Sequence, residues 1–208
     1  MEYETSYLGM RRGVCSSWLA ELPSAGPEAL PVWLFPGSLR LPADPSVPLI
    51  MVGPGTGCAP FRAILQARRA QRQRTPVGES LLFVGFRNRA ADFLYGADFE
   101  QFAADGTLSA LHVAFSRDTE SKVYVQHKMR TAGREICGLL GASAFVLVAG
   151  SSGAMPRAVR SALVEAVREC GALEIPAFAV GEAGVSAEQA EAFVKKMELS
   201  GRLQMEVY

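Results

Sequence analysis

Short apolar runs alternate with amphipathic stretches along most of this 208-residue chain, and this alternation restricts its possible folds more than any other feature. Strands that are apolar on both faces are typical of parallel sheets covered by helices on both sides. The pattern therefore predicts an α/β fold with a doubly wound parallel sheet, and a ligand site at the carboxyl ends of its strands. The apolar runs span 49–52, 81–86, 108–115 and 145–149.

Helical spacing follows each of these runs. Ser186 and Gln189 have the spacing of a capping box, which predicts one more helix to about residue 199. The alternation over 202–208 predicts a last strand. The other expected helices cover about 59–73, a short stretch ending near 99, 125–137 and 155–170.

The N-terminal part of the chain has a different composition. Most of the 12 prolines lie between 22 and 48, so we expect loops there with one short strand around 32–35. Before it, Tyr3, Thr5 and Tyr7 alternate as in a strand, but so short a segment cannot form its own core.

Two parts are therefore predicted. Residues 1–47 are expected to be the C-terminal remnant of a domain that continues upstream, with a linker. Residues 48–208 are expected to form a nucleotide-binding domain.

Charge and hydropathy exclude several classes of protein. Lys+Arg and Asp+Glu both total 21, whereas a nucleic-acid binder carries a basic excess. The longest apolar run, 144–149, is far shorter than the roughly 20 residues of a membrane span, and no signal peptide begins the sequence. We expect a cytoplasmic protein with no nucleic-acid and no membrane partner.

The four cysteines lie far apart, with no CxxC pair, and the chain has only two histidines. This spacing favours reduced, buried thiols and predicts no metal site and no disulfide framework.

A glycine-rich turn follows the first apolar run. Gly55, Thr56 and Gly57 stand between that run and a helix, where free N–H groups and the helix dipole attract a phosphate or pyrophosphate. No lysine follows the glycines, so the turn is not a P-loop. The basic residues of the next helix are interpreted as a solvated face, except Arg62, which lies one turn from the anion site.

The second strand lacks the acidic residue that usually binds the ribose of NADH, since it ends in Gly-Phe-Arg at 85–87. After the third strand, Ser116, Arg117 and Lys122 are suited to a dianionic phosphate, and the Tyr124 ring to an adenine. Alone, this cluster is equally consistent with a solvated turn. Together with the glycine turn it favours NADPH.

Small residues such as Ser151 follow the fourth strand and leave room for a flat ring, although they also suit a plain connection. Tyr208 is an aromatic terminus, either frayed or acting as a lid on a flavin.

In combination, these motifs resemble the NADPH-binding domain of the ferredoxin–NADP⁺ reductase superfamily, with the diflavin reductases as the closest branch. The resemblance covers nearly the whole chain. It extends to the cytosolic diflavin reductases of iron–sulfur protein assembly. The matching motifs are Arg-Gly-Val-Cys-Ser-Ser-Trp-Leu at 12–19, Pro-Gly-Ser-Leu at 36–39, Met-Val-Gly-Pro-Gly-Thr-Gly at 51–57, Gly-Thr-Gly-Cys-Ala-Pro-Phe-Arg at 55–62, Ala-Phe-Ser-Arg at 114–117 and Lys-Val-Tyr-Val-Gln-His at 122–127.

The resemblance implies a role for each part. Tyr208 would cover the flavin and move aside for nicotinamide, and Glu206 would stabilise charge during hydride transfer. Thr56 would contact NADP. The residues implied in FAD binding are Gly13, Val14, Cys15 and Ser16, and those in NADPH binding include Lys122, Val123, Tyr124, Val125, Gln126, Ser151 and Met155.

The chain also departs from the family pattern. No Arg-x-Tyr-Ser/Thr motif for FAD precedes Gly13, and no FMN domain is present. Ala149 stands where many relatives have cysteine, and Arg157 and Ala158 stand where an acidic residue is expected.

We therefore expect an NADPH-dependent diflavin oxidoreductase in incomplete form. NADPH would pass hydride to FAD, and electrons would continue through FMN in an upstream domain to an iron–sulfur assembly acceptor. Two alternatives stay open: a single-flavin NADPH reductase of ferredoxin or flavodoxin, and a non-catalytic NADPH-binding or interaction domain.

Overall fold

The computed structural model describes residues 2–5, 9–23, 30–178 and 184–208. The chain forms two compact units, Met1–Pro36 and Gly37–Tyr208.

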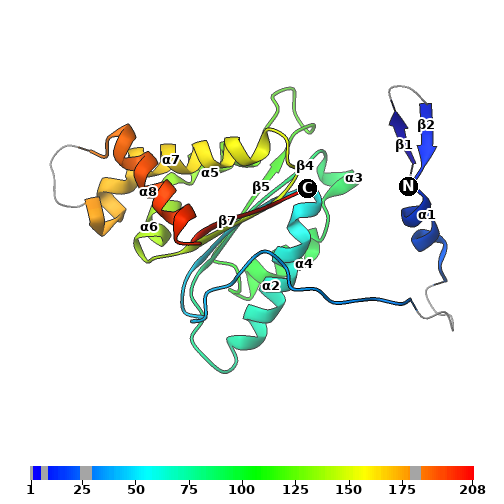
Figure 1. Ribbon diagram of the computed structural model, residues 1–208, viewed down its shortest axis with the longest axis horizontal. Coiled ribbons are helices and arrows are strands. Elements are labelled where there is room, and N and C mark those ends of the chain that lie inside the picture. Colours follow the sequence, from blue (N-terminus) through cyan, green and yellow to red (C-terminus); the bar gives the residue numbers. More distant parts are fainter. Residues whose placement is uncertain (1, 6–8, 24–29, 179–183) are drawn as a thin grey trace. The chain divides into compact units, whose positions relative to one another are not determined.

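The larger unit is built on a five-stranded sheet with the order β5-β4-β3-β6-β7, in which every neighbouring pair is parallel. The first strand of the unit, β3, lies at the centre, and the chain then winds outward in both directions. The doubly wound α/β fold predicted from the sequence is confirmed (Figure 1). The strands are β3 (Leu49–Pro54), β4 (Ser80–Phe86), β5 (Ala110–Phe115), β6 (Phe145–Gly150) and β7 (Leu203–Val207).

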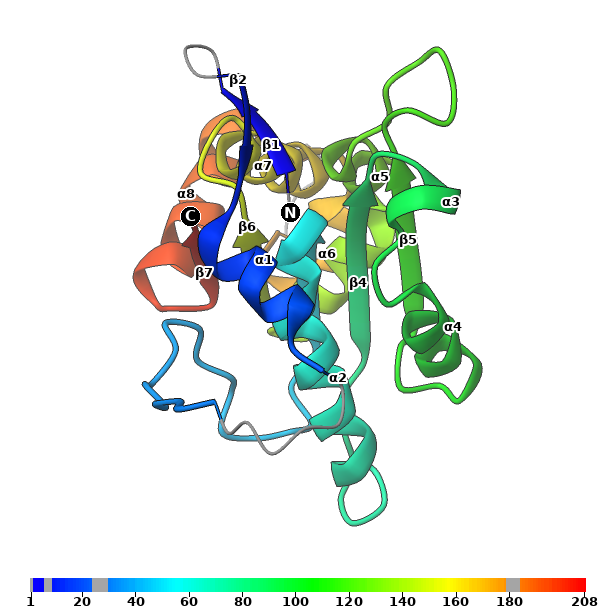
Figure 2. The same ribbon diagram turned by 90° about the vertical axis from the view of Figure 1, so that its right-hand side faces the viewer.

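Helices cover both faces of this sheet (Figures 1 and 2). Alternate residues of β3 divide between two cores: Ile50 and Val52 pack under one layer, Leu49 and Met51 under the other. One layer consists of α2 (Cys58–Gln71) and α4 (Gly96–Ala104), and the other of α5 (Val125–Thr131), α6 (Gly133–Gly141), α7 (Met155–Glu174) and α8 (Ala187–Leu199).

Two details of the helices bear on the sequence predictions. The capping box is confirmed, because the Ser186 hydroxyl accepts from Gln189 N at 3.2 Å and the Gln189 amide oxygen accepts from Ser186 N at 2.8 Å. The single helix expected over 125–137 is instead two, which divide at Ala132. Gly133 begins the second helix and packs against Ala166 of α7.

One further helix of the larger unit, α3, is short and spans Arg89–Asp92.

In the smaller unit, β1 (Glu2–Thr5) pairs antiparallel with β2 (Gly9–Arg12), and α1 (Val14–Glu21) follows. The expected strand at Tyr3 and Thr5 is confirmed, whereas Tyr7 lies outside the described residues. The strand expected at 32–35 was wrong. Those residues have no strand partner in the described part of the chain, and their side chains are 75–97% exposed.

The division between the units falls before Gly37, earlier than the boundary predicted at 47/48. Side chains of β7 explain the difference. The Ser38 hydroxyl donates to Glu206 Oε2 at 2.6 Å, and Arg40 N donates to Gln204 Oε1 at 2.6 Å. These bonds attach 37–40 to the sheet. The assignment of the parts to FAD and NADPH domains stays a prediction.

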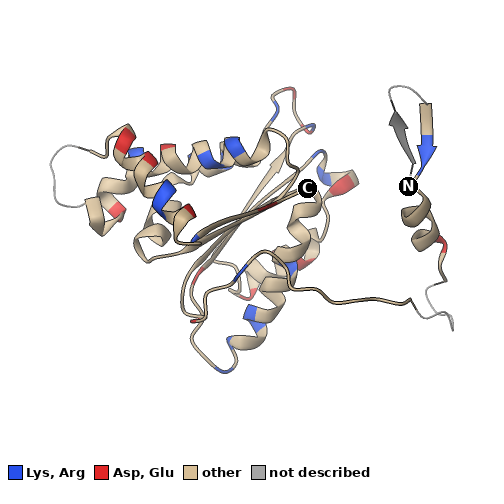
Figure 3. Ribbon diagram, viewed as in Figure 1, with Lys and Arg blue, Asp and Glu red and all other residues tan. Residues whose placement is uncertain are grey.

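The basic helix α2 is only partly a solvated face. Arg68 is 4% exposed, and its guanidinium donates to the carbonyls of Val47 and Gly78, just before β3 and β4. Burial lowers the pKa of Arg68 to about 10, which still leaves the group charged at neutral pH. The solvated interpretation was therefore wrong for Arg68. Arg69 pairs with Asp105 at 2.8 Å, and Figure 3 shows basic and acidic residues interspersed along the helices.

The expectation of buried thiols holds for two cysteines, Cys58 and Cys137. Burial raises their pKa values to about 11 and about 12, so both thiols stay neutral. Cys170 is partly buried, but Cys15 is exposed, because α1 of the small unit leaves it on the surface.

Among the described residues, we find no helix that combines the length and the apolar character needed to cross a membrane.

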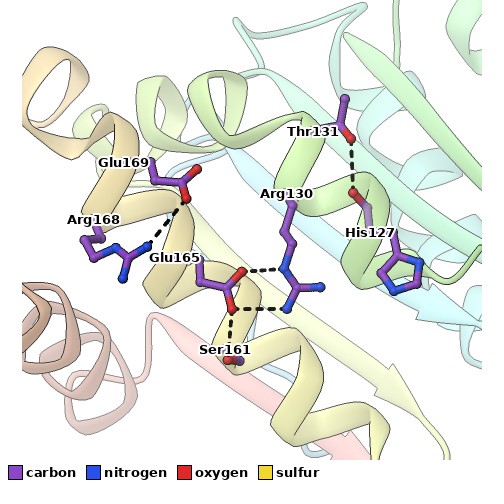
Figure 4. A network of polar contacts seen from close by, with 7 residues as sticks. All are labelled: His127, Arg130, Thr131, Ser161, Glu165, Arg168 and Glu169. Carbon is purple, nitrogen blue, oxygen red and sulfur yellow. Dashed lines mark hydrogen bonds and ion pairs between the residues drawn. The ribbon is translucent and has the colours of Figure 1, made fainter.

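An ion-pair network fastens α5 to α7 (Figure 4). The Arg130 guanidinium donates to both carboxylate oxygens of Glu165, one at 3.1 Å, and the Ser161 hydroxyl donates to the same carboxylate at 3.3 Å. The hydrogen bond from Arg130 is the main reason that the pKa of Glu165 lies below 4.5. The network holds together two helices whose first residues form walls of the site described below.

We expect Arg130→Met to lower the free energy of unfolding by about 0.5–1 kcal/mol at pH 7. A lowered carboxylate pKa contributes stability above 4.5 that is lost as the pH falls through the lowered value. The difference from the wild type should therefore shrink below pH 4, as measured by urea unfolding. Arg74→Met is the control, because Arg74 forms no ion pair within the described residues. A difference that persists undiminished at pH 3 would contradict the expectation.

Candidate functional site

A cavity of about 510 Å³ opens at the carboxyl end of the sheet, the end marked by the letter C in Figure 1. It lies where the strand order reverses, between β3 and β6, which is the usual ligand position in a doubly wound sheet. Its walls come from the turn after β3, the start of α5 and the start of α7. The lining residues are Pro54, Gly55, Tyr124, Val125, Gln126, Ser151, Ala154, Met155 and Ala158.

The glycine turn is shaped by close backbone packing. Gly55 has φ +59°, a conformation that favours glycine. A Cβ added at Gly57 would lie 2.1 Å from the carbonyl oxygen of Ala149, at the end of β6. Residues Gly55–Gly57 form a 3₁₀ turn that leads directly into α2. The backbone of the turn is therefore held beside the cavity, at the switch point, which is the place between β3 and β6 where the strand order reverses.

The second wall of the cavity is the start of α5. Gly85 makes room for it, because a Cβ there would lie 2.9 Å from Val125 Cγ1. His127 Nδ1 accepts from Tyr124 N at 3.3 Å, which satisfies one backbone donor at the start of this helix. The Tyr124 ring stays 43% exposed. Of the predicted ligand residues, Tyr124, Val125 and Gln126 are thus brought to the cavity together.

The third wall of the cavity is the start of α7, with the residues just before it. Ser151 and Met155 both line the cavity, as do the small residues Ala154 and Ala158. These side chains give the cavity a mostly apolar surface on this side, which suits the face of a flat ring.

The predicted phosphate-binding residues follow β5, outside the cavity wall. Ser116 N donates to Phe86 O at 2.9 Å, and Arg117 N donates to Arg87 O at 2.7 Å. Within the described ranges, neither the Arg117 nor the Lys122 head group forms an ion pair. In the described part of the chain, two cationic head groups therefore stand without an ion-pair partner, which leaves them available to an anion.

The paired strand ends also bring Arg87 beside Arg117, a neighbour that the sequence reasoning did not select. Its position gives the clue. Arg87 directly follows β4, where a reader of NADH has its carboxylate.

Tyr208 bridges the turn and the last strands. Its phenolic oxygen lies 2.7 Å from Thr56 Oγ1. Its N donates to Gly150 O at 3.1 Å, and its carbonyl accepts from Ser152 N at 3.0 Å. Tyr208 therefore stands at the same end of the sheet as the glycine turn, with its side chain 64% exposed.

Some predicted residues are not brought to the cavity. Arg62 points to α4, where it pairs with Asp98 and lies 4.8 Å from the Tyr95 ring centre. Its role as a cofactor ligand stays a prediction, as does that of Val123. The candidate FAD residues Gly13, Val14, Cys15 and Ser16 belong to the smaller unit, at the start of α1.

The arrangement is better suited to binding an extended, anionic nucleotide than to covalent catalysis by a protein nucleophile. A glycine turn leads into a helix, an apolar floor lies beside it, and unpaired cations follow the next strands. Cys58, the one nucleophilic thiol next to the turn, is buried and neutral.

Comparisons with known proteins agree with this geometry. Residues 51–161, more than half of the chain, match the family model of the oxidoreductase NAD-binding domain. The chain is 41% identical to NADPH-dependent diflavin oxidoreductase 1 of Arabidopsis thaliana, with 98% of this chain and 32% of that protein aligned. It is 36% identical to NADPH–cytochrome P450 reductase of Homo sapiens, over 100% of this chain and 30% of that protein. It is 38% identical to the sulfite reductase [NADPH] flavoprotein alpha-component of Bacillus subtilis (strain 168), over 95% of this chain and 30% of that protein. The chain thus spans about a third of the length of these curated relatives.

We expect Gly57→Ala to lower the free energy of unfolding by about 1–3 kcal/mol, because the new methyl group would overlap the Ala149 carbonyl. Urea unfolding followed by circular dichroism measures the change. Gly153→Ala is the matched control, since an added Cβ there would meet only Ser151 Oγ, at 4.0 Å. Equal stability of the two variants would contradict the close packing.

Proposed function

Because this chain belongs to the family of oxidoreductase NAD-binding domains, we propose that it binds NADPH and presents the nicotinamide to a flavin in a diflavin reductase. The observation that carries the proposal is the cavity at the switch point, with the glycine turn forming one of its walls. The turn and the start of α2 hold the pyrophosphate, and Tyr124, Val125 and Gln126 hold the adenosine side.

The 2′-phosphate distinguishes NADPH from NADH, and the cations after β4 and β5 support NADPH as the ligand. Arg117 and Lys122 have no ion-pair partner in the described part of the chain, and Arg87 occupies the position of the missing carboxylate. A guanidinium forms strong charge-assisted hydrogen bonds to phosphate oxygens. Ser116 adds a hydroxyl donor.

Bound FAD would supply the acceptor for the hydride of NADPH. Tyr208 covers the position that the nicotinamide takes, and its hydrogen bond to Thr56 is exchanged when Thr56 contacts the nucleotide. The nicotinamide ring becomes positively charged as hydride leaves. The Glu206 carboxylate, near the end of β7, stabilises that charge.

Only part of an FAD site lies in this chain. Helix α1 begins after Gly13 and has small side chains in its first turn, which fits the pyrophosphate of FAD. The smaller unit, Met1–Pro36, is then the end of an FAD domain. FAD and FMN domains precede it in the intact protein, as the one-third coverage of the relatives supports.

The electron acceptor we propose is an iron–sulfur assembly protein of the cytoplasm. The support is the resemblance of the motifs at 36–39 and 51–57 to that branch. Electron transfer from the intact, NADPH-reduced protein to such an acceptor, measured in a stopped-flow instrument, tests this assignment against the acceptors of the other relatives.

We expect the chain to bind NADPH more tightly than NADH in calorimetry. Arg117→Ala should weaken NADPH binding at least 10-fold, because a charge-assisted hydrogen bond contributes about 1.5–3 kcal/mol. The affinity for NADH should stay unchanged. Arg74→Ala removes the same charge in the turn that follows α2 and serves as the control. Equal affinity of the wild type for both nucleotides would exclude a 2′-phosphate site.

Tyr208→Phe should raise the affinity for NADP⁺ by about 2- to 10-fold, because it removes a neutral hydrogen bond that competes for Thr56. Tyr208→Ala, which also removes the ring, should raise it further. Calorimetry on the three proteins separates the hydroxyl from the ring. Unchanged affinity in both variants would contradict the role of Tyr208 as a displaceable cover.

A further inference from the structure

Three side chains on one side of the last strand each hold an earlier part of the chain. Gln204 binds the backbone of Arg40, Glu206 accepts from Ser38, and Tyr208 meets Thr56. They alternate along β7 and its end, so they point the same way. The segment 37–40 is thereby attached along β7.

The Gln204 side-chain amide binds both backbone polar groups of Arg40, as a neighbouring strand would. Arg40 N donates to Gln204 Oε1 at 2.6 Å, and Gln204 Nε2 donates to Arg40 O at 2.9 Å. Gln204 Nε2 also donates to Gly201 O at 2.7 Å, which fixes the amide itself. The position of Ser38, two residues before Arg40, is set by this pairing.

Glu206, in contrast, has one side-chain partner. It is exposed, and Ser38 Oγ donates to its Oε2 at 2.6 Å. Within the residues described, no ion pair or other side-chain hydrogen bond restrains this carboxylate. An exposed glutamate without a partner samples several rotamers. The hydrogen bond from the Ser38 hydroxyl therefore sets the orientation of the Glu206 carboxylate.

We propose that Ser38 is a positioning residue that orients the Glu206 carboxylate toward the nicotinamide position during hydride transfer. This role rests on the proposed function, because it requires that Glu206 faces the reacting ring in the intact flavoprotein. A carboxylate held in place before the reaction stabilises developing positive charge without a reorganisation cost. Ser38 itself touches neither nucleotide nor flavin in this role.

The orientation can be measured without any nucleotide or flavin. In the 208-residue chain, NMR scalar couplings report the χ1 populations of Glu206. We expect one dominant rotamer in the wild type and in Ser38→Thr, which keeps the hydroxyl, and averaging in Ser38→Ala. Averaged couplings in the wild type would overturn the proposal.

The kinetic test uses the intact flavoprotein and a double-mutant cycle. Ser38→Ala should slow hydride transfer by about 2- to 10-fold, the effect of one hydrogen bond, with little change in NADPH affinity. Ser38→Thr should restore the rate. In a Glu206→Gln background the same substitution should have almost no further effect, because the group that Ser38 orients has lost its charge.

Two controls separate orientation from attachment. Gln204→Ala removes the bonds to Arg40 that attach the segment but keeps the Ser38 hydroxyl and the Glu206 carboxylate, so it shows how much rate is lost through loosening alone. Ser200→Ala removes a serine whose side chain, among the described residues, donates within its own helix, at Met197 O. A rate loss by Ser38→Ala that is equally large in the Glu206→Gln background would overturn the proposal, as would no loss at all. If the wild-type chain binds no NADPH, the proposed function fails, and the role of Ser38 in transfer fails with it, even where Glu206 is ordered.

Discussion

The contact between the glycine turn and the end of β6 is the constraint on which the site depends. Gly57 lies so close to the Ala149 carbonyl that no side chain fits between them. This contact joins the first and fourth strands of the larger unit at the point where their connections diverge. It also fixes the start of α2 and one wall of the cavity. The other walls are then set by how α5 and α7 pack, with Arg130 and Glu165 fastening the two helices.

The regular part of the fold was predictable from sequence because its strands bury both faces. Runs such as 49–52 and 145–149 are apolar throughout, and each is an inner strand in the structure. The Ser186 capping box was equally local, since it depends on spacing within four residues. The cavity residues Tyr124, Gln126 and Ser151 were predictable because the carboxyl ends of parallel strands meet at one edge.

Other features depend on contacts between distant residues, which spacing does not reveal. Arg68 has the charge of a surface residue, although it lies on the same face of α2 as the buried Phe61 and Leu65. Its burial is possible because two carbonyls from separate loops meet at its guanidinium. The position of Arg87 beside Arg117 follows from the pairing of strand ends rather than from its own motif. The strand expected at 32–35 has suitable residues but no neighbouring strand among those described. A strand requires a partner, and propensity alone does not supply one.

The alternation along β7 limits how the chain can change in length during evolution. Gln204, Glu206 and Tyr208 reach their partners because each is two residues from the next. Inserting or deleting one residue near Arg202 would turn all three to the opposite face at once. A change of two residues would keep the face and only shift the partners. Length variants of this protein should therefore preserve the parity of the segment between α8 and Tyr208, even where the individual residues differ.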